Sequence, residues 1–162
     1  MAANRNTITE KIMEQLISFL ELGRASFDQA LAEANFETRF GRFDKSDVIL
    51  NPGTNASLQV SYAGTAHDPV ATGARDDTYN FNVDIMVVSK KPEIDDALLE
   101  VASSSVINYL LNDLASLQQT IAGYDWKWYH SWAGQKQFGY RRDKAIRTAR
   151  IPWFCKVYNF YY

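Results

Sequence analysis

The sequence predicts an α+β fold in which a mixed or antiparallel sheet is covered by a long helix and an N-terminal helix. Helical spacing of apolar residues occurs near the N-terminus and again within residues 92–120, and a strand-like alternation lies between these segments. A strand-rich segment follows the second helical one. The chain of 162 residues is the usual size for one core. We therefore expect a single domain over residues 1–162.

Two helices are expected at the start of the chain. The run Thr7-Ile8-Thr9-Glu10 fits a capping box, so a helix should begin at Thr7. Its apolar residues recur at helical spacing from Ile8 to Leu20, and Gly23 is a suitable end. A shorter helix should follow, from Ser26 to about Asn35.

Strands should occupy the middle of the chain. We expect short strands between Phe36 and Leu50, and a further strand at residues 58–62. The clearest strand is Tyr79–Val87, where every second residue is apolar. Residues 63–77, between these strands, are rich in Gly, Ala, Asp and Thr and have no periodicity. They predict a flexible loop.

The long helix should run from Pro92 to about Thr120, because proline followed by acids is favourable at a helix start. Beyond it, the alternation of residues 126–132 places three tryptophans and His130 on one face of a strand. A turn at residues 133–135 and a return strand at 136–142 should complete a meander. The final strand should span Ala145–Tyr162.

Pro152 bears on the position of this final strand. Proline cannot donate a hydrogen bond to a sheet, so the strand should lie at an edge or be bulged there. A bare aromatic edge is prone to aggregation. We therefore expect a neighbouring subunit or partner to cover the last aromatic residues, although packing on the chain's own first helix would also protect them.

Charge is divided unevenly along the chain. The net charge is only −2, yet residues 1–123 contain 9 Lys and Arg against 17 Asp and Glu, whereas residues 124–162 contain 8 against 2. Such asymmetry can mark a nucleic-acid-binding tail. It can equally join the basic part of one copy to the acidic part of the next. The second interpretation is favoured because strand-like aromatics interrupt the basic residues.

No catalytic or metal site is predicted. His67 and His130 lack other ligands at metal-binding spacing, and Asp84 is not followed by the residues of a two-metal nuclease. Cys155 has no neighbouring base and is expected to be structural. We thus expect no enzyme activity, metal or cofactor. The longest aliphatic run is too short to span a membrane, no signal-peptide pattern is present, and the single cysteine suits a reducing cytoplasm.

The basic final segment could form either a nucleic-acid groove or a subunit surface. In a strand, Arg142, Lys144 and Arg150 share one face, whereas Arg141 and Arg147 share the other. A single groove cannot use both sets, which favours a solvated or inter-subunit surface. The predicted subunit or partner interface consists of Arg142, Lys144, Arg147, Arg150, Trp153, Tyr158, Phe160, Tyr161 and Tyr162.

In layout, most of the chain resembles the tail terminator proteins of tailed bacteriophages. The resemblance is carried by the strand Asn82-Val83-Asp84-Ile85-Met86-Val87-Val88, by the helix with Ala97, Leu98, Val101 and Ala102 that follows, and by Arg147-Thr148-Ala149-Arg150-Ile151-Pro152-Trp153. It implies a homohexameric ring in the virion neck, assembled in the host cytoplasm. Such a ring ends tail-tube polymerisation and joins the tail to the head or connector, and DNA passes through its lumen without specific binding.

Contacts with neighbouring rings would then come from the segment at 63–77. Its candidate residues are His67, Asp68, Arg75, Asp76 and Asp77. Two other functions stay open. One is another neck component, such as a head-completion or stopper protein, and the other is a small nucleic-acid-binding protein that uses the basic C-terminal segment.

Overall fold

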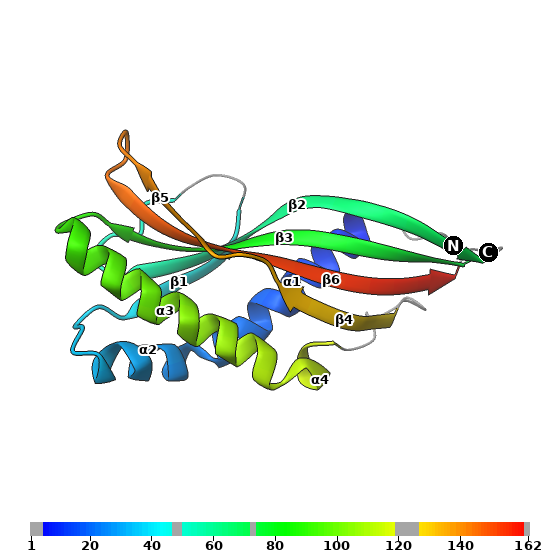
Figure 1. Ribbon diagram of the computed structural model, residues 1–162, viewed down its shortest axis with the longest axis horizontal. Helices are drawn as coiled ribbons and strands as arrows, with labels where there is room; N and C mark the ends of the chain where they lie inside the picture. Colours follow the sequence, from blue (N-terminus) through cyan, green and yellow to red (C-terminus); the bar gives the residue numbers. More distant parts are fainter. Residues whose placement is uncertain (1–4, 47–49, 72–73, 119–126, 161–162) are drawn as a thin grey trace.

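The computed structural model describes residues 5–46, 50–71, 74–118 and 127–160. A layer of helices covers one face of a six-stranded sheet, and the other face carries no helix (Figure 1). The prediction of an α+β fold is confirmed. Buried apolar residues from the helices and the sheet form one contiguous core. None of the helices described is long and apolar enough to cross a membrane.

The first two helices pack beneath the sheet. Helix α1 is Arg5–Leu22 and helix α2 is Arg24–Glu33. The predicted start at Thr7 is wrong, because the chain is already helical at Arg5. The chain turns at Gly23, where a Cβ atom would lie 2.8 Å from the rings of Phe27 and Tyr109. Glycine therefore allows this close approach of α1, α2 and the long helix.

Helix α3 is Pro92–Asn112, shorter than the predicted helix to Thr120. The backbone leaves the helical region at Asp113, whose side chain accepts a hydrogen bond from the Ser116 amide and so begins the short helix α4, Leu114–Leu117. At the other end of α3, the buried Asp95 carboxylate accepts a hydrogen bond of 2.9 Å from the Lys90 amide. The predicted start of the helix at Pro92 is confirmed.

The sheet is mixed, with strand order β1-β2-β3-β6-β4, and β5 also pairs with β6. Strands β1 and β2 are parallel and all other pairs are antiparallel. The strands are β1 Phe40–Lys45, β2 Ala56–Ala71, β3 Ala74–Val88, β4 Lys127–Ala133, β5 Gln137–Arg141 and β6 Ile146–Phe160.

The prediction of a flexible loop at 63–77 is wrong. Strands β2 and β3 continue through this segment to Ala71 and from Ala74, with a bulge between Tyr62 and Gly64. Strand β3 also pairs with β6 as far as Phe160. Residues 64–71, 74–78 and 156–160 thus form an arm of three strands that extends past the helices, with the start of β4 paired to its inner part (Figure 1). Ladder hydrogen bonds, rather than apolar burial, hold this polar segment extended, so its sequence shows no apolar period.

The prediction that β6 is an edge strand is also wrong. β6 pairs with β3 along its whole length on one side, and on the other side with β5 up to Arg150 and with β4 from Trp153. Pro152 lies in the gap between these two partners, and its carbonyl accepts a hydrogen bond of 2.7 Å from the Gly134 amide. Proline is tolerated there because its missing N–H faces the point where the partner changes.

The predicted meander of residues 126–142 is wrong as well, because β4 and β5 both pair with β6 and lie end to end along it. A bulge between Trp128 and His130 reverses the alternation of β4. Trp128 is therefore buried in the core, whereas Trp132 stacks on Phe154 of the opposite face, with ring centroids 5.2 Å apart. Trp126 lies outside the described residues.

Candidate functional site

The sheet face that carries none of the described helices, here called the open face, is polar in the middle of β3 and β6, with apolar residues at Met86, Pro152 and Phe154. On β3 it presents Asn80, Asn82 and Asp84, and on β6 it presents Thr148 and Arg150. The alternate residues of both strands are apolar and point into the core, as period-two alternation requires. A half-exposed face of this composition suits contact with water or with a hydrated partner.

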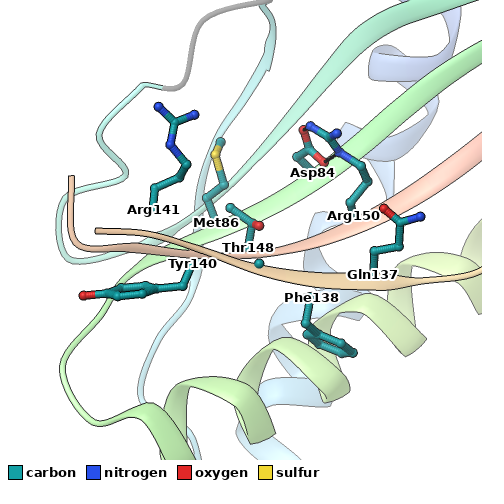
Figure 2. Close-up of a pocket in the computed structure, with 9 residues that line it drawn as sticks. Asp84, Met86, Gln137, Phe138, Tyr140, Arg141, Thr148 and Arg150 are labelled. Carbon is teal, nitrogen blue, oxygen red and sulfur yellow. Dashed lines mark hydrogen bonds and ion pairs between the residues drawn. The ribbon is translucent and has the colours of Figure 1, made fainter. Parts of the chain in front are cut away.

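Asp84 and Arg150 form a two-pronged ion pair in the middle of this face (Figure 2). Arg150 Nε lies 2.8 Å from Oδ1 and Nη2 lies 3.0 Å from Oδ2, because the two residues are direct cross-strand neighbours. Hydrogen bonding to the carboxylate raises the pKa of Arg150 further. The pair leaves this part of the open face without net charge.

A cavity of about 340 Å³ adjoins the ion pair. Figure 2 shows that it is shared among β3, β5 and β6, with Gln137 beside the Asp84–Arg150 pair and Arg141 farther along the same strand. Its lining residues are Asp84, Met86, Gln137, Phe138, Gly139, Tyr140, Arg141, Thr148 and Arg150. Its one carboxylate, that of Asp84, is held in the ion pair with Arg150.

On the other side of β5, two aromatic rings lie over α3 and are held by basic side chains. Lys136 Nζ lies 5.6 Å from the centre of the Phe138 ring and 2.9 Å from Glu100. Phe138 points away from the Asp84–Arg150 pair and toward α3 (Figure 2). Cation–π contact and the ion pair together fix this ring at the surface.

The second ring, Tyr140, is held in the same way. The Arg147 guanidinium lies 4.8 Å from the centre of the Tyr140 ring and 3.1 Å from Asp96. Asp96 and Glu100 are one helical turn apart on α3, and Phe138 and Tyr140 are two residues apart on β5, so the two arrangements run side by side. Neither ring is among the predicted site residues, although their spacing of two is typical of one strand face.

The predicted interface residues do not form one surface. Arg142 and Lys144 lie in the exposed turn after β5, Arg147 points toward α3, and Arg150 points to the open face. The expectation that Arg147 and Arg150 lie on opposite faces is confirmed. The expectation that Arg141 shares the face of Arg147 is wrong, because a turn separates β5 from β6 and Arg141 lines the open-face cavity together with Arg150. Trp153 is completely buried in the core, so its assignment to a partner interface is wrong.

The aromatic end of the chain is described only in part. Tyr158 is half-buried on β6, and Phe160 is the last residue of that strand. Tyr161 and Tyr162 lie outside the described residues. The assignment of Tyr158, Phe160, Tyr161 and Tyr162 to a partner interface stays a prediction.

The predicted loop residues all lie on the arm. His67 Nδ1 is 2.5 Å from an oxygen of the buried Asp77, and the two are direct cross-strand partners. Asp68 lies opposite Asp76 in the backbone register of the same two strands. Arg75 lies on β3 within the arm. Whether these residues contact a neighbouring ring stays a prediction.

A tyrosine from β4 lies close to the arm's acidic residues. Burial, a hydrogen bond with Asp76 and the charges of Asp76 and Asp68 raise the pKa of Tyr129 to about 12. The phenol thus stays protonated at neutral pH and can donate to Asp76.

Neither histidine nor the cysteine forms a reactive centre in the part of the chain that is described. There, no group of three His, Cys, Asp or Glu side chains could hold a metal ion. His130 is exposed and stacks on Trp132, with ring centroids 5.2 Å apart. Cys155 is fully buried, and this burial raises the pKa of its thiol well above the usual range.

We expect Cys155 to resist thiol reagents in the folded protein. The thiolate is the reactive form, and burial both disfavours it and blocks access. Reaction with a chromogenic disulfide should be fast in denaturant and negligible in native buffer at pH 8. Burial raises the pKa of this thiol in the folded state, so the thiol of the unfolded chain ionises first. The free energy of unfolding should therefore fall as pH rises above about 9. Rapid labelling without denaturant would show that the β4–β6 region opens readily.

Comparison with known proteins does not assign the chain to a family. No family model matches it, and no curated protein matches its sequence. Among solved structures, one described as the virion of a native gene transfer agent particle aligns over 84% of this chain and 94% of its own, with 11% identity and a TM-score of 0.46. A second, whose description gives no function, aligns over 88% and 96%, with 19% identity and a TM-score of 0.42. At these identities and scores, neither likeness carries an argument about function.

Proposed function

We propose that this protein is a structural subunit of a phage-like virion, a tail terminator that forms a ring in the neck. The observation that carries the proposal is the polar open face with its neutralised Asp84–Arg150 pair. The layout and strand patterns that resemble tail terminators supply the identity of the ring. The subunit's task is geometric, since it ends tube growth and joins tail to head.

In such a ring the open face is suited to line the lumen. The lumen surface that DNA slides past should be hydrated. It should carry few unpaired basic groups, because basic groups that neutralise phosphates release counterions and so bind the DNA. Asn80, Asn82 and Thr148 provide hydrogen-bonding groups without charge, and Arg150 is neutralised by Asp84. Binding to nucleic acid through the basic segment is less well supported, because Arg147 and Arg150 point to opposite faces and each already has an acidic partner.

Native mass spectrometry tests the ring directly. The expected result is a species of about six times the 18.5 kDa subunit, or a stack of such rings. DNA affinity should be measured on the same sample at two salt concentrations. A monomer that binds DNA with a steep salt dependence would contradict the terminator function and favour the nucleic-acid-binding alternative.

Removing Asp84 should turn the open face into a DNA-binding surface. Asp84→Ala leaves the Arg150 guanidinium without its carboxylate, so the variant should bind duplex DNA more tightly than the wild type, with a steeper salt dependence. Electrophoretic mobility shifts at low and physiological salt measure both quantities. The double variant Asp84→Ala/Arg150→Ala is the matched control and should return to wild-type affinity. Equal affinity of all three proteins would show that the open face does not meet DNA.

A further inference from the structure

Among the residues that the structure describes, strand β5 is an exposed edge of the sheet. It pairs with β6 on one side, and all of its residues, Gln137–Arg141, are exposed to solvent. An edge strand presents backbone N–H and C=O groups that another chain can pair with. This end of the sheet can therefore accept an additional strand.

β1 forms the opposite edge of the sheet, and side chains of α2 bind the backbone at the start of this strand. Arg24 Nη1 donates to the carbonyl oxygens of Phe40 and Gly41, at 3.2 and 2.6 Å, and the Phe40 amide donates to Asp28 at 2.8 Å. These bonds occupy backbone groups of β1 that a further strand would need. β1 and β5 differ in this respect, and β5 is the better template of these two; β4, which lies end to end with β5, also pairs with β6 alone in the described residues.

The two aromatic rings on β5 are positioned to receive side chains of an added strand. Phe138 and Tyr140 are 49% and 45% exposed, which is high for large apolar residues. Lys136 and Arg147 hold the rings in place through cation–π contacts. Ordered aromatic residues bind at low entropic cost and are common centres of protein interfaces.

The other face of β5 is polar and basic. It borders the 340 Å³ cavity, where Gln137 and Arg141 extend from the strand (Figure 2). The turn that follows, residues 141–144, contains three basic residues and one acidic residue, Asp143, which pairs with Arg141 at 3.4 Å, so the turn carries a net charge of +2. Because side chains of an added strand alternate between faces, one set would meet the rings and the other would meet this positive charge.

We propose that the β5 edge binds an extended acidic segment of another virion protein by strand addition. The apolar side chains of that segment pack on Phe138 and Tyr140, and its acidic side chains face Arg141 and the basic turn. Main-chain hydrogen bonds to β5 supply affinity, and the alternation supplies specificity. Only the choice of a virion protein as partner rests on the proposed function; strand addition itself rests on the geometry of β5.

A designed peptide tests the proposal on the full-length protein. The probe is a fluorescein-labelled peptide that alternates glutamate and leucine, and its binding is followed by fluorescence anisotropy. The wild type should bind it, whereas a peptide of the same pattern with lysine in place of glutamate should bind at least roughly tenfold more weakly. Equal binding of the two peptides, or no binding of either, would overturn the proposal.

Two further comparisons identify strand addition at β5. Phe138→Ala/Tyr140→Ala should weaken binding roughly tenfold or more, whereas Tyr129→Ala, which removes a 45% exposed aromatic from β4, should not. N-methylation of alternate peptide residues should abolish binding in one register and leave it nearly unchanged in the other, because a strand donates its amides alternately to each side. If both registers bind equally, the peptide does not add as a strand and the proposal fails.

Native mass spectrometry of the same variants separates this proposal from the proposed function. A wild-type protein that binds the peptide but stays monomeric contradicts the ring, not the β5 site. A ring that does not bind the peptide contradicts the β5 site alone. If Phe138→Ala/Tyr140→Ala abolishes the ring itself, the occupant of β5 is a second copy of this chain, and the proposal of a different partner is overturned.

Discussion

Trp153→Ala should destabilise the protein by about 3–5 kcal/mol, the usual cost of removing a large buried aromatic side chain. Trp153 is completely buried in the core, on a strand paired on both sides. The surrounding sheet cannot collapse into the space that the indole leaves. Chemical denaturation should show a lower midpoint with an unchanged slope, which reports a loss of stability without a change in compactness.

Trp132→Ala is the matched control for this prediction. Trp132 lies on the neighbouring strand and stacks on Phe154, but it is only partly buried on the open face. Its removal should lower the free energy of unfolding by about 1 kcal/mol, because the variant loses one aromatic pair and the contacts of a partly buried ring. Equal losses for the two variants would show that Trp153 is not the core residue that the structure describes. It would then again be a candidate for a partner contact.

Asp95→Ala should reduce the free energy of unfolding by about 1–3 kcal/mol, because the substitution removes the buried carboxylate that accepts the part-buried hydrogen bond from the Lys90 amide. The Asp95 carboxylate is 7% exposed and receives the Lys90 amide at 2.9 Å and the Ser89 hydroxyl at 3.3 Å. It thereby joins the end of β3 to the start of α3. Thermal and chemical denaturation of the purified variant measure the loss.

Asp96→Ala separates this effect from loss of negative charge at the helix start. Asp96 is the next residue, and its ion pair with Arg147 at 3.1 Å is largely exposed on the acidic side. An exposed pair of this kind contributes at most about 1 kcal/mol. Asp95→Asn keeps an acceptor and should retain part of the stability. If Asp96→Ala costs as much as Asp95→Ala, charge at the helix start matters more than the buried hydrogen bonds.

Elements that bury one face could be predicted from the sequence. The alternation of Tyr79–Val87 and the helical stripe from Leu99 to Leu110 each reflect contact with the core on one side only. Such a pattern is local, since it depends on the geometry of one strand or one helix. Both elements exist where the sequence predicts them, although α3 already ends at Asn112 and β3 already begins at Ala74.

Strand partners could not be predicted, because pairing is not a local property. Pro152 correctly indicated a missing ladder hydrogen bond, yet the strand is interior because two short strands share one of its sides. The polar arm at 64–71 and 74–78 has no apolar alternation, since its pairing replaces burial. The bulge at Trp128/His130 likewise reverses a face without any local signal in the residues.

The candidate site shows the same division. The separation of Arg147 and Arg150 onto two faces followed from strand geometry and is confirmed. The ion pair of Arg150 with Asp84 joins residues 66 positions apart and depends on the register of β3 against β6. The rings of Phe138 and Tyr140 became visible as a surface only once β5 was placed at the sheet edge over α3.

The division of one side of β6 between β4 and β5 also bears on how this part of the protein opens. β5 has five residues, all exposed, and a single strand partner in the described structure, whereas β6 is paired throughout. Short exposed elements of this kind unfold locally at low free energy while the core stays intact. Amide hydrogen exchange in β5 should accordingly be faster than in β6. An incoming strand would then have two routes at this edge, either adding beside β5 or displacing it from β6.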